Sequence, residues 1–459
     1  MNKTFNYKII YSLFFLIVSI LISNQYLNKF EKNLFKVGNY EFSSIYQTDS
    51  IFYIEEAEKI RTDINSGKKF LESGGAYYFS YLYPKIIFFF NKIVNKDISL
   101  IDKNKIDFKN YKIFIFFQIT IFFISLITLY KALSKNMEKR LVIILVSVIF
   151  LNPIIFQWHM SFLTESLFLS FLIFSISLLL SSKNYFHFFL LGILIGILYM
   201  LRTIALLYPI IFIFYLFIQR KNINQKILNC FSVLTGLILI LLFIGTNNYL
   251  RAQVFYFTPM QTKSDLNTYI EAAILIKSKN FDAFQAREHI NEKTEKILDD
   301  EKLDLSNERD KLFFLKKVQR NSIKTIFDNK IAFLEIISKN YFHSLLLNPT
   351  QVYFAAKYQY WQELKNSYDH KHWLKIRIII TLLFFTLSLF GFIISIKKIS
   401  FDLNIFLFFS ILYFFFTSCW LGNTRYFVPS VLFMGVYLSL ALDKIYEKIN
   451  IKIESNYNK

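Results

Sequence analysis

Apolar residues along the chain gather in runs of about 20 residues, the helix length that crosses a hydrocarbon core of roughly 30 Å. These runs predict an all-α polytopic membrane protein with about ten transmembrane helices. The basic N-terminus and its apolar stretch lack a small-residue cleavage site, which predicts an uncleaved first helix. The ten runs lie near residues 8–27, 111–132, 140–157, 163–181, 186–201, 203–219, 227–246, 375–396, 403–421 and 425–442.

The apolar stretch from residue 186 to 218 is too long for one crossing. Its roughly 33 residues would form a helix of about 50 Å at 1.5 Å per residue, which would require extreme tilt. We therefore predict two short helices that meet near Arg202.

Charges at the helix ends predict the orientation of the chain in the membrane. Basic residues cluster in the connections that follow alternate spans, whereas the short turns on the other side are nearly uncharged. By the positive-inside rule, both termini are predicted to be cytoplasmic in a multi-pass protein of the cytoplasmic membrane. These basic residues are Lys131, Lys135, Lys139, Arg140, Lys183, Arg220, Lys221, Lys226, Lys397 and Lys398.

This topology places two long polar segments outside the cytoplasm, residues 28–110 and 247–374. The predicted organisation is an N-terminal membrane module over 1–246 that carries the first outer loop, a helical outer segment over 247–374, and C-terminal membrane helices with a short tail over 375–459. The second segment holds a charged stretch from residue 291 to 327 with Glu and Lys at helical spacings.

The first outer loop contains two predicted helices. The stretch "IYQTDSIFYIEEAEKI" presents Ile51, Ile54, Ala57 and Ile60 on one face of an amphipathic helix that opens at Asp49. Farther on, "YLYPKIIFFFNKIVNK" is too short to span a membrane and is flanked by lysines. This pattern is typical of a helix that lies in the membrane interface.

Composition narrows the function classes. The chain has 459 residues, of which 54% are hydrophobic, and a formal charge of +20. Membrane orientation accounts for much of this charge, so we predict no nucleic-acid partner. Cys230 and Cys419 lie in apolar runs without metal-ligand spacing and are predicted to be core residues. The sequence has no P-loop, GxSxG or HExxH motif, which argues against a nucleotide-driven cytosolic enzyme.

Five ionisable residues lie at the predicted outer ends of helices, where they could converge on one cavity that faces outward. Charged groups near a bilayer are costly and tend to serve function. Three of them are arginines on the predicted outer side, opposite the side where basic residues cluster. Arginines in such a position favour an anionic partner such as phosphate. The five are Asp49, Glu165, Arg202, Arg251 and Arg425.

Each of these residues also has a purely structural interpretation. As an N-cap, Asp49 would contribute about 1 kcal/mol, and Glu165 interacts favourably with the dipole of the helix that it opens. The arginines are also typical of boundary positions, with stems in lipid and heads in water. A lone histidine such as His159 is more often a core residue than a base or a ligand.

The order of the motifs resembles the GT-C class of membrane glycosyltransferases, in particular the branch of protein O-mannosyltransferases and lipid A aminoarabinose transferases. "TDSIFYIEEAEKI" is similar to that family's acid followed by an aromatic residue and an amphipathic helix. Further segments agree in order and rough spacing. They are "YLYPKIIFFF", "NPIIFQWHMSFLTESLFLSFLIF", "GILIGILYMLRTIALLYPIIF", "NNYLRAQVFYF" and "NTRYFVPSVLF".

The resemblance implies an inverting transfer of a sugar from a polyprenyl-phosphate donor to an extracytoplasmic acceptor, such as a protein, a lipid or a glycan of the bacterial cell envelope. Ser50 stands where some relatives carry a second acid, so Glu165 is the candidate for that place. No ligand cluster identifies a metal, which leaves a divalent cation open as a cofactor. The implied residues are Asp49 and Glu165 for catalysis; Arg202, Arg251, Arg425 and Lys85 for the donor phosphate; and Tyr53, Tyr83, His159 and Tyr426 around the substrate.

Two other functions also fit the sequence. An O-antigen polymerase or ligase would use a diphosphate-linked oligosaccharide, although its large loop usually lies late in the chain. A flippase or transporter of lipid-linked sugars would favour paired halves and charges at the midplane, and the sequence has no internal repeat.

Overall fold

Helices dominate the part of the chain that the structure, a computed structural model, describes. Short antiparallel hairpins pair β1 (Leu34–Val37) with β2 (Tyr40–Ser43) and β3 (Leu100–Asp102) with β4 (Lys105–Ile106). The predicted span at 8–27 falls almost wholly outside the described residues. The described residues are 17, 21, 25, 34–37, 40–43, 48–74, 80–94, 100–102, 105–106, 111–135, 137–182, 184–219, 222–258, 266–345, 368–418 and 424–457.

Each of the other predicted apolar runs forms helix in the structure. Among the described helices, five are long and apolar enough to cross a membrane, and a sixth crossing is possible if α5 and α6, bent by 57°, form one span. The chain is therefore a multi-pass membrane protein, but the predicted count of ten is not confirmed, because α7, α8 and α9 are shorter. The helices are α4 (Tyr111–Leu133), α5 (Lys139–Leu151), α6 (Pro153–His159), α7 (Glu165–Ser181), α8 (Tyr185–Leu201), α9 (Pro209–Ile218), α10 (Ile223–Ala252), α18 (Tyr368–Lys398), α19 (Phe401–Ser418) and α20 (Thr424–Tyr457).

The predicted break near Arg202 is confirmed. Helix α8 ends at Leu201, and Arg202 has an extended backbone with φ −148° and ψ 128°. A short 3₁₀ turn, η2 (Thr203–Ala205), follows, and α9 then begins at Pro209. Proline suits a first helical turn because its missing N–H is not needed there. Arg202 thus lies between two helices and not within one.

Glycines let two pairs of helices pack backbone to backbone. A Cβ atom at Gly192 of α8 would overlap the carbonyl oxygen of Val233 in α10, and one at Gly236 would overlap Phe189. A Cβ atom at Gly391 of α18 would overlap Tyr437 in α20 in the same way. These close contacts fix α8 against α10 and α18 against α20.

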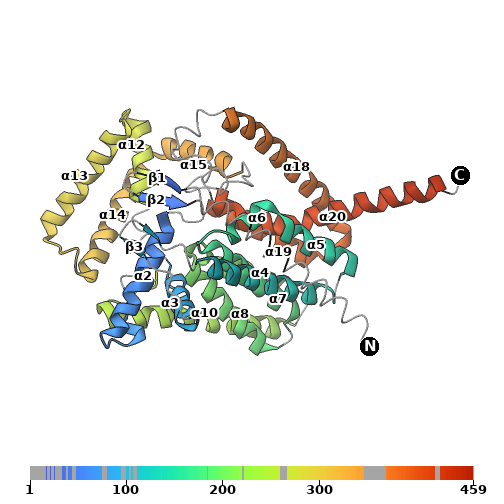
Figure 1. The fold of residues 1–459 in the computed structure, drawn as a ribbon, viewed down its shortest axis with the longest axis horizontal. Coiled ribbons are helices and arrows are strands. Elements are labelled where there is room, and N and C mark those ends of the chain that lie inside the picture. Colours follow the sequence, from blue (N-terminus) through green and yellow to red (C-terminus); the bar gives the residue numbers. More distant parts are fainter. Residues whose placement is uncertain are drawn as a thin grey trace.

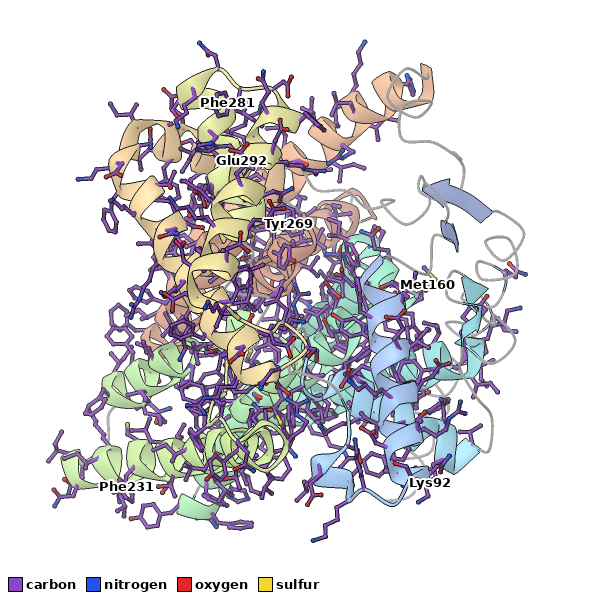
Figure 2. The ribbon with its side chains drawn as sticks, turned by 90° about the vertical axis from the view of Figure 1, so that its left-hand side faces the viewer. Lys92, Met160, Phe231, Tyr269, Phe281 and Glu292 are labelled. Atoms are coloured by element: carbon purple, nitrogen blue, oxygen red, sulfur yellow. The ribbon has the colours of Figure 1, made fainter. Side chains whose placement is uncertain are left out.

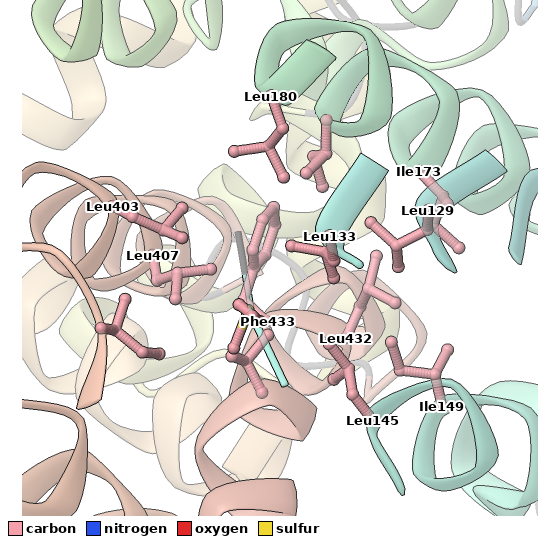
Figure 3. Close-up of a pocket in the computed structure, with 14 residues that line it drawn as sticks. Leu129, Leu133, Leu145, Ile149, Ile173, Leu180, Leu403, Leu407, Leu432 and Phe433 are labelled. Atoms are coloured by element: carbon pink, nitrogen blue, oxygen red, sulfur yellow. The ribbon is translucent and has the colours of Figure 1, made fainter. Parts of the chain in front are cut away.

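Side-chain contacts assign the helix ends to two faces of the bundle. We call the side where α7 begins and α8 ends the site face, and the side where α7 ends and α8 begins the opposite face. An apolar cavity at the opposite face brings together Leu133, Leu180 and Leu403 from the ends of α4, α7 and α19 (Figure 3). Nearby, Asp443 of α20 pairs with Arg140 and Lys398. The basic ends of α4, α5 and α18 therefore share one face, and the cytoplasmic orientation of that face stays a prediction.

Further helices lie at the site face. Helix α2 (Thr48–Asn65) packs against α3 (Tyr83–Val94), which exposes the apolar side chains of Phe89 and Ile93 as an interfacial helix would. Figure 1 shows these helices, with α12, α13 and α14, at the end of the molecule away from the C-terminus. The predicted charged helices of the second polar segment are present (Figure 2, where Glu292 marks α13). That segment contains η3 (Leu266–Glu271), α12 (Ala272–Lys279), α13 (Ala283–Glu301), α14 (Glu308–Asp328) and α15 (Lys330–Leu345).

Candidate active site at one face of the bundle

A buried ion pair joins Glu165 and Arg202. Glu165 is the first residue of α7, as the sequence predicted, and Arg202 follows the last residue of α8. Their side chains are only 4% and 8% exposed. The guanidinium carbon of Arg202 also lies 4.7 Å from the centre of the Tyr426 ring in α20. Three helices thus meet at one charged group.

Burial makes the stability of this site depend on both members of the ion pair. Removing two charges from water costs several kcal/mol for each ion, and the attraction between them offsets that cost only when both are present. A cation over an aromatic face adds roughly 0.5–2 kcal/mol, depending on how dry the site is. Glu165 and Arg202 therefore hold each other in place, and Tyr426 covers the arginine.

Helix α2 is attached beside this pair through Ser50. The Ser50 hydroxyl is fully buried and donates a 2.8 Å hydrogen bond to the carbonyl of Phe162, in the turn that leads to Glu165. Ser50, which stands where some relatives carry a second acid, thus anchors α2. Helix α2 begins at Thr48, so the N-cap interpretation of Asp49 is wrong. Its carboxylate lies in the first turn, where the helix dipole still favours negative charge.

A chain of hydrogen bonds connects α3 and α4 to the same turn. The Tyr83 hydroxyl donates to the Gln118 side-chain oxygen at 2.9 Å, and the Gln118 amide donates to the Ser161 carbonyl at 3.1 Å. The Tyr53 ring of α2 meets the Tyr83 ring edge to face at 5.0 Å. Burial, with Tyr53 and Glu165 nearby, raises the pKa of Tyr83, which stays a neutral hydrogen-bond donor.

Lys85 occupies a partly apolar position on α3. Its ammonium lies 3.8 Å from the centre of the Tyr81 ring. Burial lowers the pKa of Lys85 to about 8; Arg251 acts in the same direction, and Glu56 opposes both. In the described part of the chain, no carboxylate lies within ion-pair distance of Lys85. A buried ammonium of this kind is poised to accept an anion.

Arg251 connects the end of α10 to the outer helix α14. It donates hydrogen bonds to the Glu308 carboxylate at 2.7 Å, to the Asn248 side chain at 3.0 Å and to the Tyr256 hydroxyl at 3.0 Å. The Tyr256 hydroxyl also donates to Glu308. The positive charge of Arg251 is therefore balanced by Glu308.

The loop before α3, which leads to Lys85, binds the end of α8, which leads to Arg202. The backbone N–H groups of Tyr81 and Leu82 donate to the Met200 carbonyl at 3.1 and 3.2 Å, and the Ser80 hydroxyl donates to the same oxygen at 3.1 Å. Met200 precedes Arg202 by two residues. The Tyr81 hydroxyl also donates to Asn247 of α10 at 2.6 Å. The loop that leads to Lys85 is thus held against the ends of both α8 and α10.

Other predicted site residues are placed differently. His159 is fully buried; its ring stacks on Phe122 at 3.7 Å, and its Nδ1 lies 2.7 Å from the Ser166 hydroxyl. It therefore packs behind Glu165 in the core. The side chain of Arg425 lies outside the described residues. Over the described ranges, no group of three His, Cys, Asp or Glu residues could hold a metal ion.

Several residues of the site were missed from the sequence. Gln118 is a fully buried amide within the apolar run of α4, and its isolation there was a usable signal, because unpaired polar groups are costly in a membrane. Glu308 lay in a region rich in charge, where nothing distinguished it. Ser50 was noted only as the absence of an acid.

Comparison with solved structures shows which known proteins this chain resembles in fold. No protein-family model and no curated protein matches the chain. The structure is similar to the archaeal oligosaccharyltransferase AglB from Archaeoglobus fulgidus, in complex with an inhibitory peptide and a dolichol-phosphate. The TM-score is 0.53 at 12% identity, over 99% of this chain and 52% of that one. An oligosaccharyltransferase from the same organism, tethered to an acceptor peptide with the NVT sequon, gives 0.52 at 12% identity, over 96% and 50%.

The chain therefore spans about half the length of the proteins that it matches. AglB is a GT-C membrane glycosyltransferase. The similarity shows that this chain shares its fold, in agreement with the GT-C resemblance of the sequence motifs.

The buried ion pair predicts strongly non-additive effects on stability. Glu165→Gln or Arg202→Gln alone leaves one buried charge without its partner, which costs about 3–5 kcal/mol. The double variant removes both charges, so its thermal midpoint in detergent should lie above that of either single variant.

Lys277→Gln provides the control. Lys277 pairs with Glu335 at an exposed site, where both side chains are about half exposed, and its loss should change the midpoint little. If the two single effects simply add in the double variant, Glu165 and Arg202 do not depend on each other.

Proposed function

We propose that the protein is an integral-membrane glycosyltransferase. It transfers a sugar from a polyprenyl-phosphate donor to an acceptor at the site face. The observation that carries the proposal is the convergence of the Asp49 helix, the Glu165–Arg202 pair and Lys85 around one turn and one loop. The shared fold with a GT-C glycosyltransferase supports it. We assign the chain to the polyprenyl-phosphate branch suggested by its motifs.

Charge balance distinguishes the candidate phosphate ligands. Glu308 neutralises Arg251, and Glu165 neutralises Arg202. Lys85 has no such partner among the described residues, so it is the principal counterion for the donor phosphate. Arg202 still has N–H groups available for a bidentate contact with phosphate oxygens. Fixed cations at the leaving phosphate stabilise the negative charge that develops as the bond to the sugar breaks.

Asp49 is the acid that acts on the acceptor. As the acceptor oxygen attacks the anomeric carbon, its proton passes to the Asp49 carboxylate and the bond from that carbon to the phosphate oxygen breaks. Polyprenyl phosphate leaves, and the configuration at the anomeric carbon inverts. Glu165, held by Arg202 in a buried pair, positions the arginine and supplies negative charge near the reacting centre. The sugar and the acceptor stay unassigned.

A second donor class has one specific observation in its favour. The neighbours in fold are oligosaccharyltransferases, and one was solved with a dolichol-phosphate. A lipid-linked oligosaccharide is therefore the alternative donor, as the O-antigen ligase hypothesis also requires. Competition between monophosphate-linked and diphosphate-linked donors separates these cases, and movement of donor across proteoliposomes without a glycosidic product would favour a flippase.

Substitution of Asp49 tests the proposed reaction. Asp49→Asn keeps the size of the side chain but removes the base, so turnover of a polyprenyl-phosphate sugar by purified protein should fall roughly 10²- to 10⁴-fold. Glu55→Gln is the matched control, because Glu55 lies on the exposed side of the same helix. Full turnover by a folded Asp49→Asn protein would remove Asp49 from the mechanism.

The pKa of Lys85 predicts a pH dependence. The donor phosphodiester keeps one negative charge near neutral pH, while Lys85 loses its positive charge as the pH rises through about 8. The value of kcat/KM for the donor should therefore fall above pH 8, by at most about tenfold per pH unit. Lys85→Arg keeps its charge throughout and should abolish this fall.

Lys92→Arg, at an exposed position of α3, should leave the profile unchanged. A fall above pH 8 that persists in Lys85→Arg would assign the titration to another group.

A further inference from the structure

A second groove lies at the opposite face, away from the candidate active site. It has a volume of about 430 Å³ and lies between α4, α7 and α8. Its floor is apolar, and its rim carries hydroxyls and two lysines. Glu165 and Ser181 are the two ends of α7, about 25 Å apart at 1.5 Å per residue. The described lining residues are Thr128, Lys131, Ala132, Lys135, Phe174, Ser177, Leu178, Ser181 and Leu194.

The groove carries positive charge that its described lining does not balance. Lys131 and Lys135 stand one turn apart at the end of α4, both exposed, and no acidic residue is among the described lining residues. The ends of α4 and α7 each contribute about half a negative charge through the helix dipole. The positive charge of the two ammonium groups therefore exceeds the negative charge of the two helix ends by about one elementary charge.

Two other basic residues at this face are already paired. Arg140 binds Asp443 and Glu447, and Lys398 binds the same two carboxylates. Lys131 and Lys135 make no such pair among the described residues. The groove is thus a distinct site of free positive charge beside the bilayer.

The hydroxyls on the rim present acceptor oxygens. Thr128 donates its hydrogen to the Ser125 carbonyl at 2.7 Å, Ser177 to Ile173 at 2.7 Å and Ser181 to Ser177 at 2.8 Å. The Thr128 and Ser177 hydroxyl oxygens also lie 3.4 Å apart, and all three hydroxyl-bearing residues line the groove. Such a rim suits a ligand that combines an anionic phosphate with hydroxyl donors and an apolar tail.

We propose that this groove binds the headgroup of an anionic membrane lipid. The phosphate lies between Lys131 and Lys135, headgroup hydroxyls donate to the rim, and one acyl chain follows Phe174, Leu178 and Leu194. Basic pockets between membrane helices are established sites for such headgroups. The site is independent of the sugar-transfer proposal, because it lies at the other face and requires no reaction.

Native mass spectrometry of the full chain in detergent, with added phosphatidylglycerol, tests this site. Wild-type protein should retain phosphatidylglycerol in preference to phosphatidylcholine with the same acyl chains. Lys131→Gln with Lys135→Gln should weaken phosphatidylglycerol binding about 30-fold, from the contribution of two lysines near a membrane surface. Glutamine is a good helix former, so α4 should persist.

The control is Lys397→Gln with Lys448→Gln, which removes two exposed lysines at the same face but outside the groove. It should bind phosphatidylglycerol as the wild type does. Equal retention of phosphatidylcholine, unchanged binding by the groove variant, or displacement of the lipid by millimolar inorganic phosphate would each overturn the proposal.

Discussion

The buried ion pair between Glu165 and Arg202 is the constraint on which the site depends. A carboxylate and a guanidinium can be withdrawn from water together only if their helices end at the same depth. Helix α7 must therefore begin at Glu165, and α8 must stop at Leu201. The short apolar helices of this bundle follow from that requirement. Tyr426 adds α20 to the arrangement, because its ring covers the arginine.

Short helices expose carbonyl groups that longer ones would satisfy internally, and such groups are costly beside a membrane. The outer segments of this protein supply the missing donors. Met200 accepts three hydrogen bonds from residues 80–82, and Phe162 accepts one from Ser50. The helix that carries Asp49 and the loop that leads to Lys85 are thus held by the broken ends of the helices. The same breaks that create the charged site also position the segments around it.

The sequence predicted most boundaries of this fold. Hydrophobic run lengths located the helices, and the length of the stretch from 186 to 218 placed the break at Arg202. The sequence could not show which charged residues, far apart along the chain, form ion pairs in the fold. Glu165 and Arg202 are separated by a full helical hairpin, and Arg251 meets Glu308 from another outer segment. Arg251 looked like a phosphate ligand because its counterion could not be identified from spacing alone. The N-cap assignment failed because α2 starts one residue before Asp49.

We propose that the donor phosphate binds at the site face between Lys85 and Arg202. An experimental structure of the protein with a bound polyprenyl monophosphate tests it most directly. We expect the phosphate to contact the Lys85 ammonium and the Arg202 guanidinium, with the Glu165–Arg202 pair intact and Asp49 facing the same space. A phosphate bound at the opposite face, or held at the site face by neither cation, would contradict it.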